Sequence, residues 1–259
     1  MTDIVVAERV FRDSTSGVSV TARIFAPRKS EDSSDWSCRI DIQGLAAPFD
    51  RSIFGVDSFQ ALVLATSLLC TILERHEAGL AFLDGPPGDC ALPLIASCPV
   101  TMKADVREFI RGKIEDDLNA QEGAIEPGPV AMATHTAHGA VAERLFRDSR
   151  SGASVIARIF TPEPAGPSRW TCRISVDGLA VPFATSALGV DSFQALCLGL
   201  RRLCAHLETD EARLGFPDGD PGDGSLPLIA LCLPASSKPE VHRFVEGKIR
   251  DHLSKRGSS

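Results

Sequence analysis

Alternating apolar and polar residues predict β-strands in the first part of the chain. Every second residue is apolar over residues 18–25, and the same alternation runs over residues 36–43. A period of two is typical of a strand with one buried face. The segment 4–13 also has an extended pattern, and the turn sequence Ser-Thr-Ser-Gly after it predicts a hairpin. A fourth strand is expected over residues 48–54.

The periodicity changes to that of a helix after Asp57. The Asp57 carboxylate can accept hydrogen bonds from the free amides of a first helical turn, and Gln60 can reach back in a capping box. Apolar residues then recur at helical spacing as far as Leu73. A short apolar strand over residues 92–98 and a final helix, apolar on one stripe from Val106 to Leu118, are expected to follow.

The whole pattern occurs twice. The sequence VAERVFRDSTSGVSVTARIF (6–25) returns as VAERLFRDSRSGASVIARIF (141–160), and GVDSFQAL (55–62) returns at 189–196. A spacing of this size corresponds to one domain and is far too long for a solenoid repeat. We therefore expect a first α+β repeat over residues 1–119, an Ala/Gly/Pro-rich linker over 120–139, and a second repeat over 140–259 that ends in a short disordered tail.

Strands followed by helices, with short hairpins between strands, predict the α+β class. Each copy is expected to form an antiparallel β-sheet with two helices packed on one face, and to have its own hydrophobic interior. Two domains from one ancestor also suggest that the copies pair about a pseudo-two-fold axis, as in an isologous dimer.

Three segments together resemble a family of small bacterial domains of unknown function. They are VAER near the start, Trp-x-Cys on a middle strand, and GVDSFQAL at the opening of a helix. The resemblance covers most of each copy, and GVDSFQAL is its most specific part. It implies an α+β fold and a bacterial source, and it brings no activity or catalytic residue with it. The tandem form departs from the single-copy pattern of that family, so its usual oligomeric state does not carry over.

Composition and charge narrow the possible functions. The chain has 44% hydrophobic and 24% charged residues, as globular proteins do, and its net charge of -7 disfavours nucleic acid as a partner. No signal peptide is visible, and the most apolar stretch (61–73) is too short to span a bilayer. We expect a cytoplasmic protein with no membrane partner. The eight cysteines contain no CxxC pair, which favours reduced, buried thiols.

No motif of a known catalytic or phosphate-binding site occurs. None of the six histidines has a histidine at the equivalent position of the other copy. Asp218, Asp220 and Asp223 cluster in a glycine-rich loop, but their spacing does not match an EF-hand, so a solvated turn is expected. We predict no catalytic residue, no metal site and no cofactor. Trp36 and Trp170 are expected to pack in the interior.

One face of the predicted sheets is a candidate interaction face, because arginine and phenylalanine gather there in both copies. This combination is enriched at the centre of protein interfaces. The alternatives are a solvated face whose arginines pair with acids, and a site for bases or an anion. The candidate interaction face consists of Arg9, Phe11, Arg23, Phe25, Arg39, Arg144, Phe146, Arg158, Phe160 and Arg173. A structural role as helix caps is assigned to Asp57, Gln60, Asp191 and Gln194.

These observations favour a non-enzymatic module that binds another protein through its sheet face or its helix face. An immunity-type inhibitor that covers a toxin is one specific form, and an acidic chain would suit a basic target. Two alternatives stay open. One is a small-ligand binder or enzyme with a pocket between the two copies, and the other is a structural subunit of an assembly.

Overall fold

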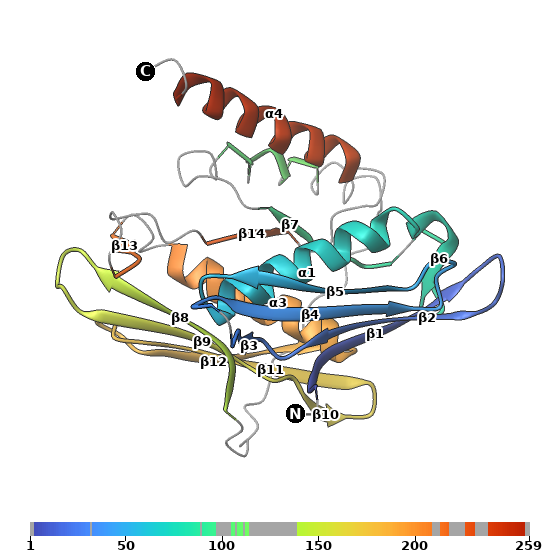
Figure 1. Ribbon diagram of the computed structural model, residues 1–259, viewed down its shortest axis with the longest axis horizontal. Helices are drawn as coiled ribbons and strands as arrows, with labels where there is room; N and C mark the ends of the chain where they lie inside the picture. Colours follow the sequence, from blue (N-terminus) through green and yellow to red (C-terminus); the bar gives the residue numbers. More distant parts are fainter. Residues whose placement is uncertain are drawn as a thin grey trace.

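The computed structural model describes residues 3–31, 33–88, 90–96, 105–106, 108–110, 112–113, 139–208, 213–217, 226–230 and 238–256. Within these ranges each copy forms one large antiparallel sheet (Figure 1). The strands of copy one are β1 (Val5–Asp13), β2 (Ser19–Phe25), β3 (Arg28–Lys29), β4 (Trp36–Gln43), β5 (Phe49–Gly55) and β6 (Leu80–Phe82). Copy two repeats them as β8 (Ala140–Asp148), β9 (Ser154–Phe160), β10 (Glu163–Gly166), β11 (Arg169–Asp177), β12 (Phe183–Gly189) and β13 (Leu214–Gly215).

The two sheets have the same strand order. It is β5-β4-β2-β1-β6 in copy one and β12-β11-β9-β8-β13 in copy two, and the short strands β3 and β10 pair with β4 and β11. The alternation in the sequence sets which face is buried: Val20, Ala22 and Ile24 on β2 have no exposed surface. The predicted α+β class with antiparallel sheets is confirmed.

One long helix lies on the sheet of each copy. Helix α1 (Ser58–Glu74) packs on β4 and β5, and α3 (Ser192–Glu208) packs on β11 and β12. A short 3-10 helix (Glu77–Gly79) follows α1. The start of α1 is fixed by the Asp57 carboxylate, which accepts from the Gln60 amide at 2.6 Å, while the Gln60 side chain accepts from the Val56 amide at 2.9 Å. Val190, Asp191 and Gln194 repeat both hydrogen bonds at α3.

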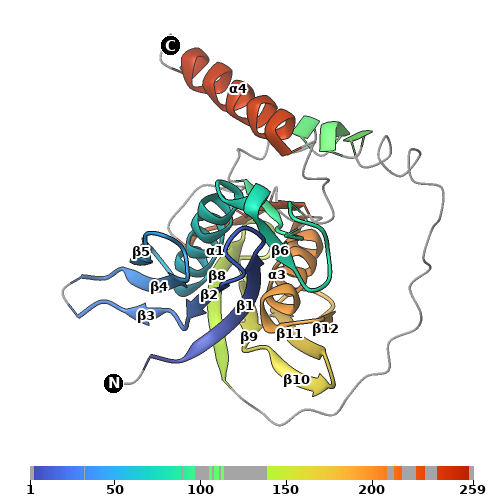
Figure 2. The same ribbon diagram turned by 90° about the vertical axis from the view of Figure 1, so that its right-hand side faces the viewer.

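The second helix expected on each sheet is placed differently. Helix α4 (Lys238–Arg256) lies at the end of the molecule away from the large sheets (Figures 1 and 2). Strands β7 (Leu94–Ala96) and β14 (Leu228–Ala230) belong to different copies and pair with each other. Their side chains form a separate apolar cluster with α4 and with helical residues between 105 and 113. The apolar stripe of α4 is therefore covered by elements of both copies and not by the face of its own sheet.

The copies also share their main interior, contrary to the expectation of separate ones. A single cluster of buried residues contains side chains from both sheets and from both long helices. The reason is that α1 contacts β8 of copy two and α3 contacts β1 of copy one, in addition to their own sheets. The buried residues of each helix cover a broad face, so each helix packs on its own sheet and also on the first strand of the other copy.

Several sequence-based expectations concern residues outside the described ranges. They are the linker up to residue 138, the acidic loop with Asp218, Asp220 and Asp223, and the C-terminal tail after residue 256. Six of the eight cysteines are described, and all six are buried thiols outside any disulfide. Burial raises the pKa of the Cys38 thiol to about 12, which keeps it protonated. None of the described helices combines the length and apolar character needed to cross a membrane.

Candidate functional site

The two most specific sequence motifs meet where the copies join. Arg9 of the first VAER lies on β1, and its guanidinium donates to both carboxylate oxygens of Asp191, at 2.7 and 3.1 Å. Arg144 of the second VAER binds Asp57 in the same way, at 2.8 and 3.2 Å. Both arginine side chains are 1% exposed. The junction therefore contains two reciprocal, two-pronged ion pairs, the strongest geometry for such pairs.

The serine after each aspartate binds the backbone of the other copy. The Ser58 hydroxyl accepts from the Glu143 amide at 2.9 Å and donates to the Glu143 carbonyl at 3.1 Å. The Ser192 hydroxyl makes the same two bonds with Glu8, at 2.8 and 3.2 Å. Each helix N-terminus is thereby fixed to the first strand of the opposite copy.

Aromatic rings cover the buried guanidinium groups. The central carbon of Arg9 lies 4.0 Å from the ring centroid of Phe82 and 4.9 Å from that of Phe193. Arg144 lies similarly between Phe59 and Phe216, at 5.0 and 5.1 Å. Each arginine is thus enclosed by one ring of its own copy and one of the other. A buried cation is tolerated only when it is paired and its donors are satisfied. The counter-ion of Arg9 comes from the other copy, while its remaining donors bind the carbonyls of Cys90 and Ala91 in its own copy.

Four residues of the predicted interaction face are therefore not on a surface. Arg9, Phe11, Arg144 and Phe146 are each only 1% exposed. The expectation that they form an exposed face is corrected by the phase of the first strand of each copy: the positions of Ala7, Arg9 and Phe11 point into the shared interior.

Of the remaining predicted residues, Phe25 is buried as well, at 8% exposed. The arginines lie on the outer faces, where Arg23, Arg39 and Arg158 bind nearby acids. Arg23 donates to Glu8 at 2.6 Å and to Asp41 at 3.4 Å, and these bonds raise its pKa. Arg39 binds Asp50 and Asp3, and the hydrogen bond from Arg39 lowers the pKa of Asp50.

Copy two repeats the arrangement. Arg158 binds Glu143 and Asp177. Arg173 lies over the ring of Phe160, at 3.9 Å, as Arg39 lies over Phe25, at 4.7 Å. The outer faces thus contain internally paired charges, which matches the alternative of a solvated face.

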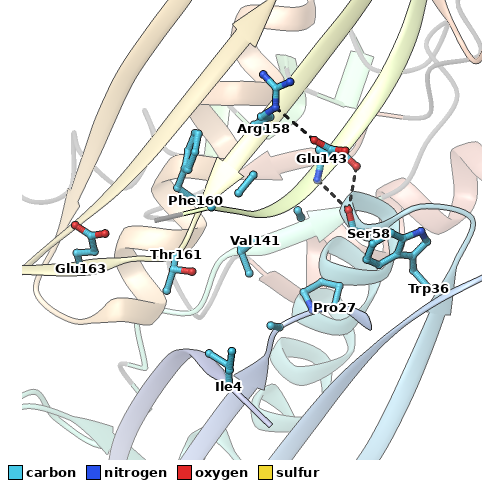
Figure 3. A pocket seen from close by; sticks show the side chains of 14 residues that line it. Ile4, Pro27, Trp36, Ser58, Val141, Glu143, Arg158, Phe160, Thr161 and Glu163 are labelled. Carbon is cyan, nitrogen blue, oxygen red and sulfur yellow. Dashed lines mark hydrogen bonds and ion pairs between the residues drawn. The ribbon is translucent and has the colours of Figure 1, made fainter. Parts of the chain in front are cut away.

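A cleft opens beside each set of junction contacts. The first cleft, of about 960 Å³, is lined by Trp36, Pro27 and Ser58 of copy one and by Val141 and Glu143 of copy two, among others (Figure 3).

The second cleft, of about 520 Å³, has the equivalent residues with the copies exchanged. Trp170, Pro162 and Ser192 come from copy two, while Val6 and Glu8 come from copy one. The repeat therefore builds the same kind of cleft twice, and each one needs both copies.

The polar groups that line the first cleft already bind one another. In the first cleft the Ser58 hydroxyl is engaged by the Glu143 backbone and the Glu143 carboxylate by Arg158 (Figure 3). No histidine or cysteine belongs to the described lining of either cleft, and no three metal-binding side chains gather anywhere in the described ranges. An indole, apolar side chains and a carboxylate suit an apolar group that carries a positive charge.

The sequence predicts Trp36 and Trp170 in the interior; both pack against the core, but they are half-buried and also line the clefts. The spacing predicts Asp57 and Asp191 as helix caps but does not predict their second bond, to an arginine. The signal available was the repetition itself, because VAER and GVDS recur together in both copies.

A family model described as a domain of unknown function, DUF6968, matches this chain twice, over residues 7–94 and 142–225. The two matches together cover more than half of the chain and confirm the expected tandem duplication within a family of unknown function. No curated protein and no solved structure matches the chain.

Proposed function

The chain belongs to the DUF6968 family, whose domain it carries twice, and from its twin clefts we propose that it is a protein-interaction module for basic, apolar segments of a partner. The observation that carries the proposal is the recurrence of one cleft at two equivalent places. Each combines a tryptophan, a proline and a helix-capping turn of one copy with a glutamate of the other.

Exposed apolar side chains support a protein partner. Val5, Val10, Leu83 and Val190 all line the second cleft, and each is more than two-fifths exposed. Apolar side chains gathered on the surface of a folded chain are a mark of interaction sites. The tryptophan of each cleft supplies a ring of the kind that anchors protein interfaces.

Charge supports a basic partner. The first cleft is lined by Glu143 and Glu163 with Arg158, which leaves it one excess negative charge. In the second cleft Asp191 binds Arg9, and Glu8 binds Arg23 of the outer face. The net charge of the chain, -7, adds a longer-range attraction for cations. An inhibitor that covers a basic toxin is one form of this function. The outer sheet faces contribute less, because their arginines already bind Glu8, Asp41, Asp50 and Asp177.

A binder of small molecules is the second candidate. Volumes of about 960 and 520 Å³ lie within the range of ligand pockets. The two candidates differ in the size of the occupant, because a peptide segment is long enough to cover Trp170 together with the exposed valines and Leu83 that line the second cleft.

Tryptophan fluorescence tests the proposal directly. The chain has two tryptophans and no tyrosine, and each tryptophan lines one cleft. The variant Trp170→Phe reports the first cleft alone, and Trp36→Phe reports the second. Peptides selected from a random display library on the wild-type chain are titrated into both variants. We expect lysine- or arginine-containing apolar peptides to shift the emission with saturation, and matched peptides with glutamate in place of the basic residues to leave it unchanged.

Selected peptides that bind without changing either emission would contradict the proposal. A shift produced only by compounds of small size, in a parallel titration with a fragment library, would favour the second candidate. The control variant Arg39→Gln alters the outer face of copy one and should leave peptide binding intact.

A further inference from the structure

The junction that assembles the clefts is built from residues present in both copies. We propose that it is a docking surface for any domain of the same kind, so that one copy pairs with an equivalent copy of a second molecule of this chain as well as with its own neighbour. This inference concerns the junction and does not depend on what the clefts bind.

Each copy contains both partners of the junction contacts that the arginines and serines make. Copy one holds Arg9 and also Asp57, which binds the arginine of copy two. Copy one also contains the Ser58 hydroxyl, which binds the backbone of copy two, and the Glu8 backbone, to which Ser192 of copy two binds. In a pair of two first copies, Arg9 of each would therefore find Asp57 of the other. Copy two likewise contains both partners of each of these contacts.

The separate cluster around α4 has the same property. Phe109 stacks on Phe244, its own counterpart, with centroids 4.1 Å apart and planes 2° from parallel. Lys113 binds Glu240 at 2.8 Å, and Lys248 binds Asp105 at 2.5 Å. A lysine of each copy thus binds an acidic residue of the other copy.

Strands β7 and β14 show the same self-pairing, since Ile95 pairs with its counterpart Ile229. Counterparts that meet on one axis, flanked by reciprocal contacts, define an isologous interface, and such an interface is complementary to itself.

Pairing also completes the clefts. The first cleft takes its tryptophan from copy one and its glutamate from copy two, and the second cleft takes them in the opposite sense. A pair of first copies from two molecules would rebuild the same cleft from Trp36 of one molecule and Glu8 of the other. The second molecule therefore contributes residues to the site.

The experiment separates the halves without removing either. A specific protease site is inserted after residue 125, and the folded chain is cut, unfolded in denaturant and refolded as a mixture. Native mass spectrometry then weighs the products, since the two halves differ in mass. We expect the halves only as pairs, and we expect all three kinds: two first copies, two second copies, and one of each. Single halves, or mixed pairs alone, would overturn the proposal.

The uncut chain provides an independent measurement. Refolding at high protein concentration should yield a species of twice the chain mass through exchange of copies between molecules. The double variant Arg9→Gln and Arg144→Gln should lower this yield at least tenfold, whereas Arg39→Gln, on the outer face, should match the wild type. A dimer yield that the double variant leaves unchanged would contradict the role of the junction. Circular dichroism checks that each variant is folded.

Discussion

Arg9 and Arg144 are the largest side chains that are fully buried, and they determine how the copies fit together. Each bonds both carboxylate oxygens of an aspartate on the other copy, and Arg9 also donates to the carbonyls of Cys90 and Ala91 at 3.0 Å. The aspartates are at once helix caps and counter-ions. Removing one partner of such a pair leaves a charge without compensation away from water, which costs far more than losing a surface ion pair.

Substitution of a buried arginine should be strongly destabilising. We expect Arg9→Ala to lower the free energy of unfolding by roughly 3–5 kcal/mol, because Asp191 loses its counter-ion and the rings of Phe82 and Phe193 lose their contact. Arg39→Ala, on the outer face with 37% of its side chain exposed, should cost about 0–1 kcal/mol. Denaturant unfolding followed by circular dichroism measures both. Equal losses for the two variants would contradict the structural role given to Arg9.

The beginning of each long helix is determined by a short segment of sequence. A glycine precedes each capping turn because there is no space for a side chain: a Cβ at Gly55 would lie 2.4 Å from the amide nitrogen of Ala61. The spacing alone predicts capping by Asp57 and the return bond of Gln60. It does not predict the bond of Asp57 to Arg144, because 87 residues separate the two and only the folded chain brings them together.

The variant Gly55→Ala tests this packing. We expect it to destabilise the chain by about 1–3 kcal/mol, since the added methyl group forces the start of α1 away from β5. Gly79→Ala is the matched control, because a Cβ there meets nothing within 4 Å, and it should change the stability by less than about 1 kcal/mol in either direction. Thermal unfolding measures the stability of both variants. A Gly55→Ala variant as stable as the wild type would contradict the close approach of Gly55 to Ala61.

Helix α4 is attached to α1 through a contact that depends on pH. His242 lies 3.3 Å from Glu74, and the contact with this carboxylate raises the pKa of His242 above its ordinary value of 6.5. Lys238 of α4, also near Glu74, opposes this shift, and Glu246 adds to it. Because the pKa is raised by folding, the stabilisation is complete below pH 6.5 and is lost as the pH rises through the higher value of the folded state.

Hydrogen exchange should detect this loss. We expect the protection factors of amides around residues 241–249 to fall between pH 6 and pH 8, after correction for the intrinsic exchange rates. In the variant His242→Gln the same amides should show little change with pH, whereas His76→Gln, which alters an exposed histidine, should behave like the wild type. Protection that rises with pH in the wild type would reverse the sign and refute the contact.

The shared interior makes the two copies one cooperative body. A single buried cluster runs through both sheets, and each long helix contacts the first strand of the other copy. Neither sheet can lose its helix without exposing apolar surface of the other copy, which links the unfolding of the copies.

Single-tryptophan variants measure this cooperativity. In Trp170→Phe the remaining Trp36 reports copy one, and in Trp36→Phe the remaining Trp170 reports copy two. After correction for the stability of each variant, we expect the emission of both to change at the same denaturant concentration as the circular dichroism of the chain. Two transitions separated beyond error, with one tryptophan following each, would show that the copies unfold independently.

Local sequence was sufficient for those features that depend on neighbouring residues. Alternation predicted the strands β2 and β4, the extended pattern before the first turn predicted β1, capping residues predicted the starts of α1 and α3, and the repeat predicted two copies of one topology. Such patterns are readable because they reflect contacts between residues a few positions apart. The tertiary structure alone decided that Arg9 and Arg144 lie inside, that the interior is common to both copies, and that α4 packs away from its sheet. These features depend on contacts between distant segments, and a chain that is apolar on several faces leaves the choice among partners to the packing of the folded molecule.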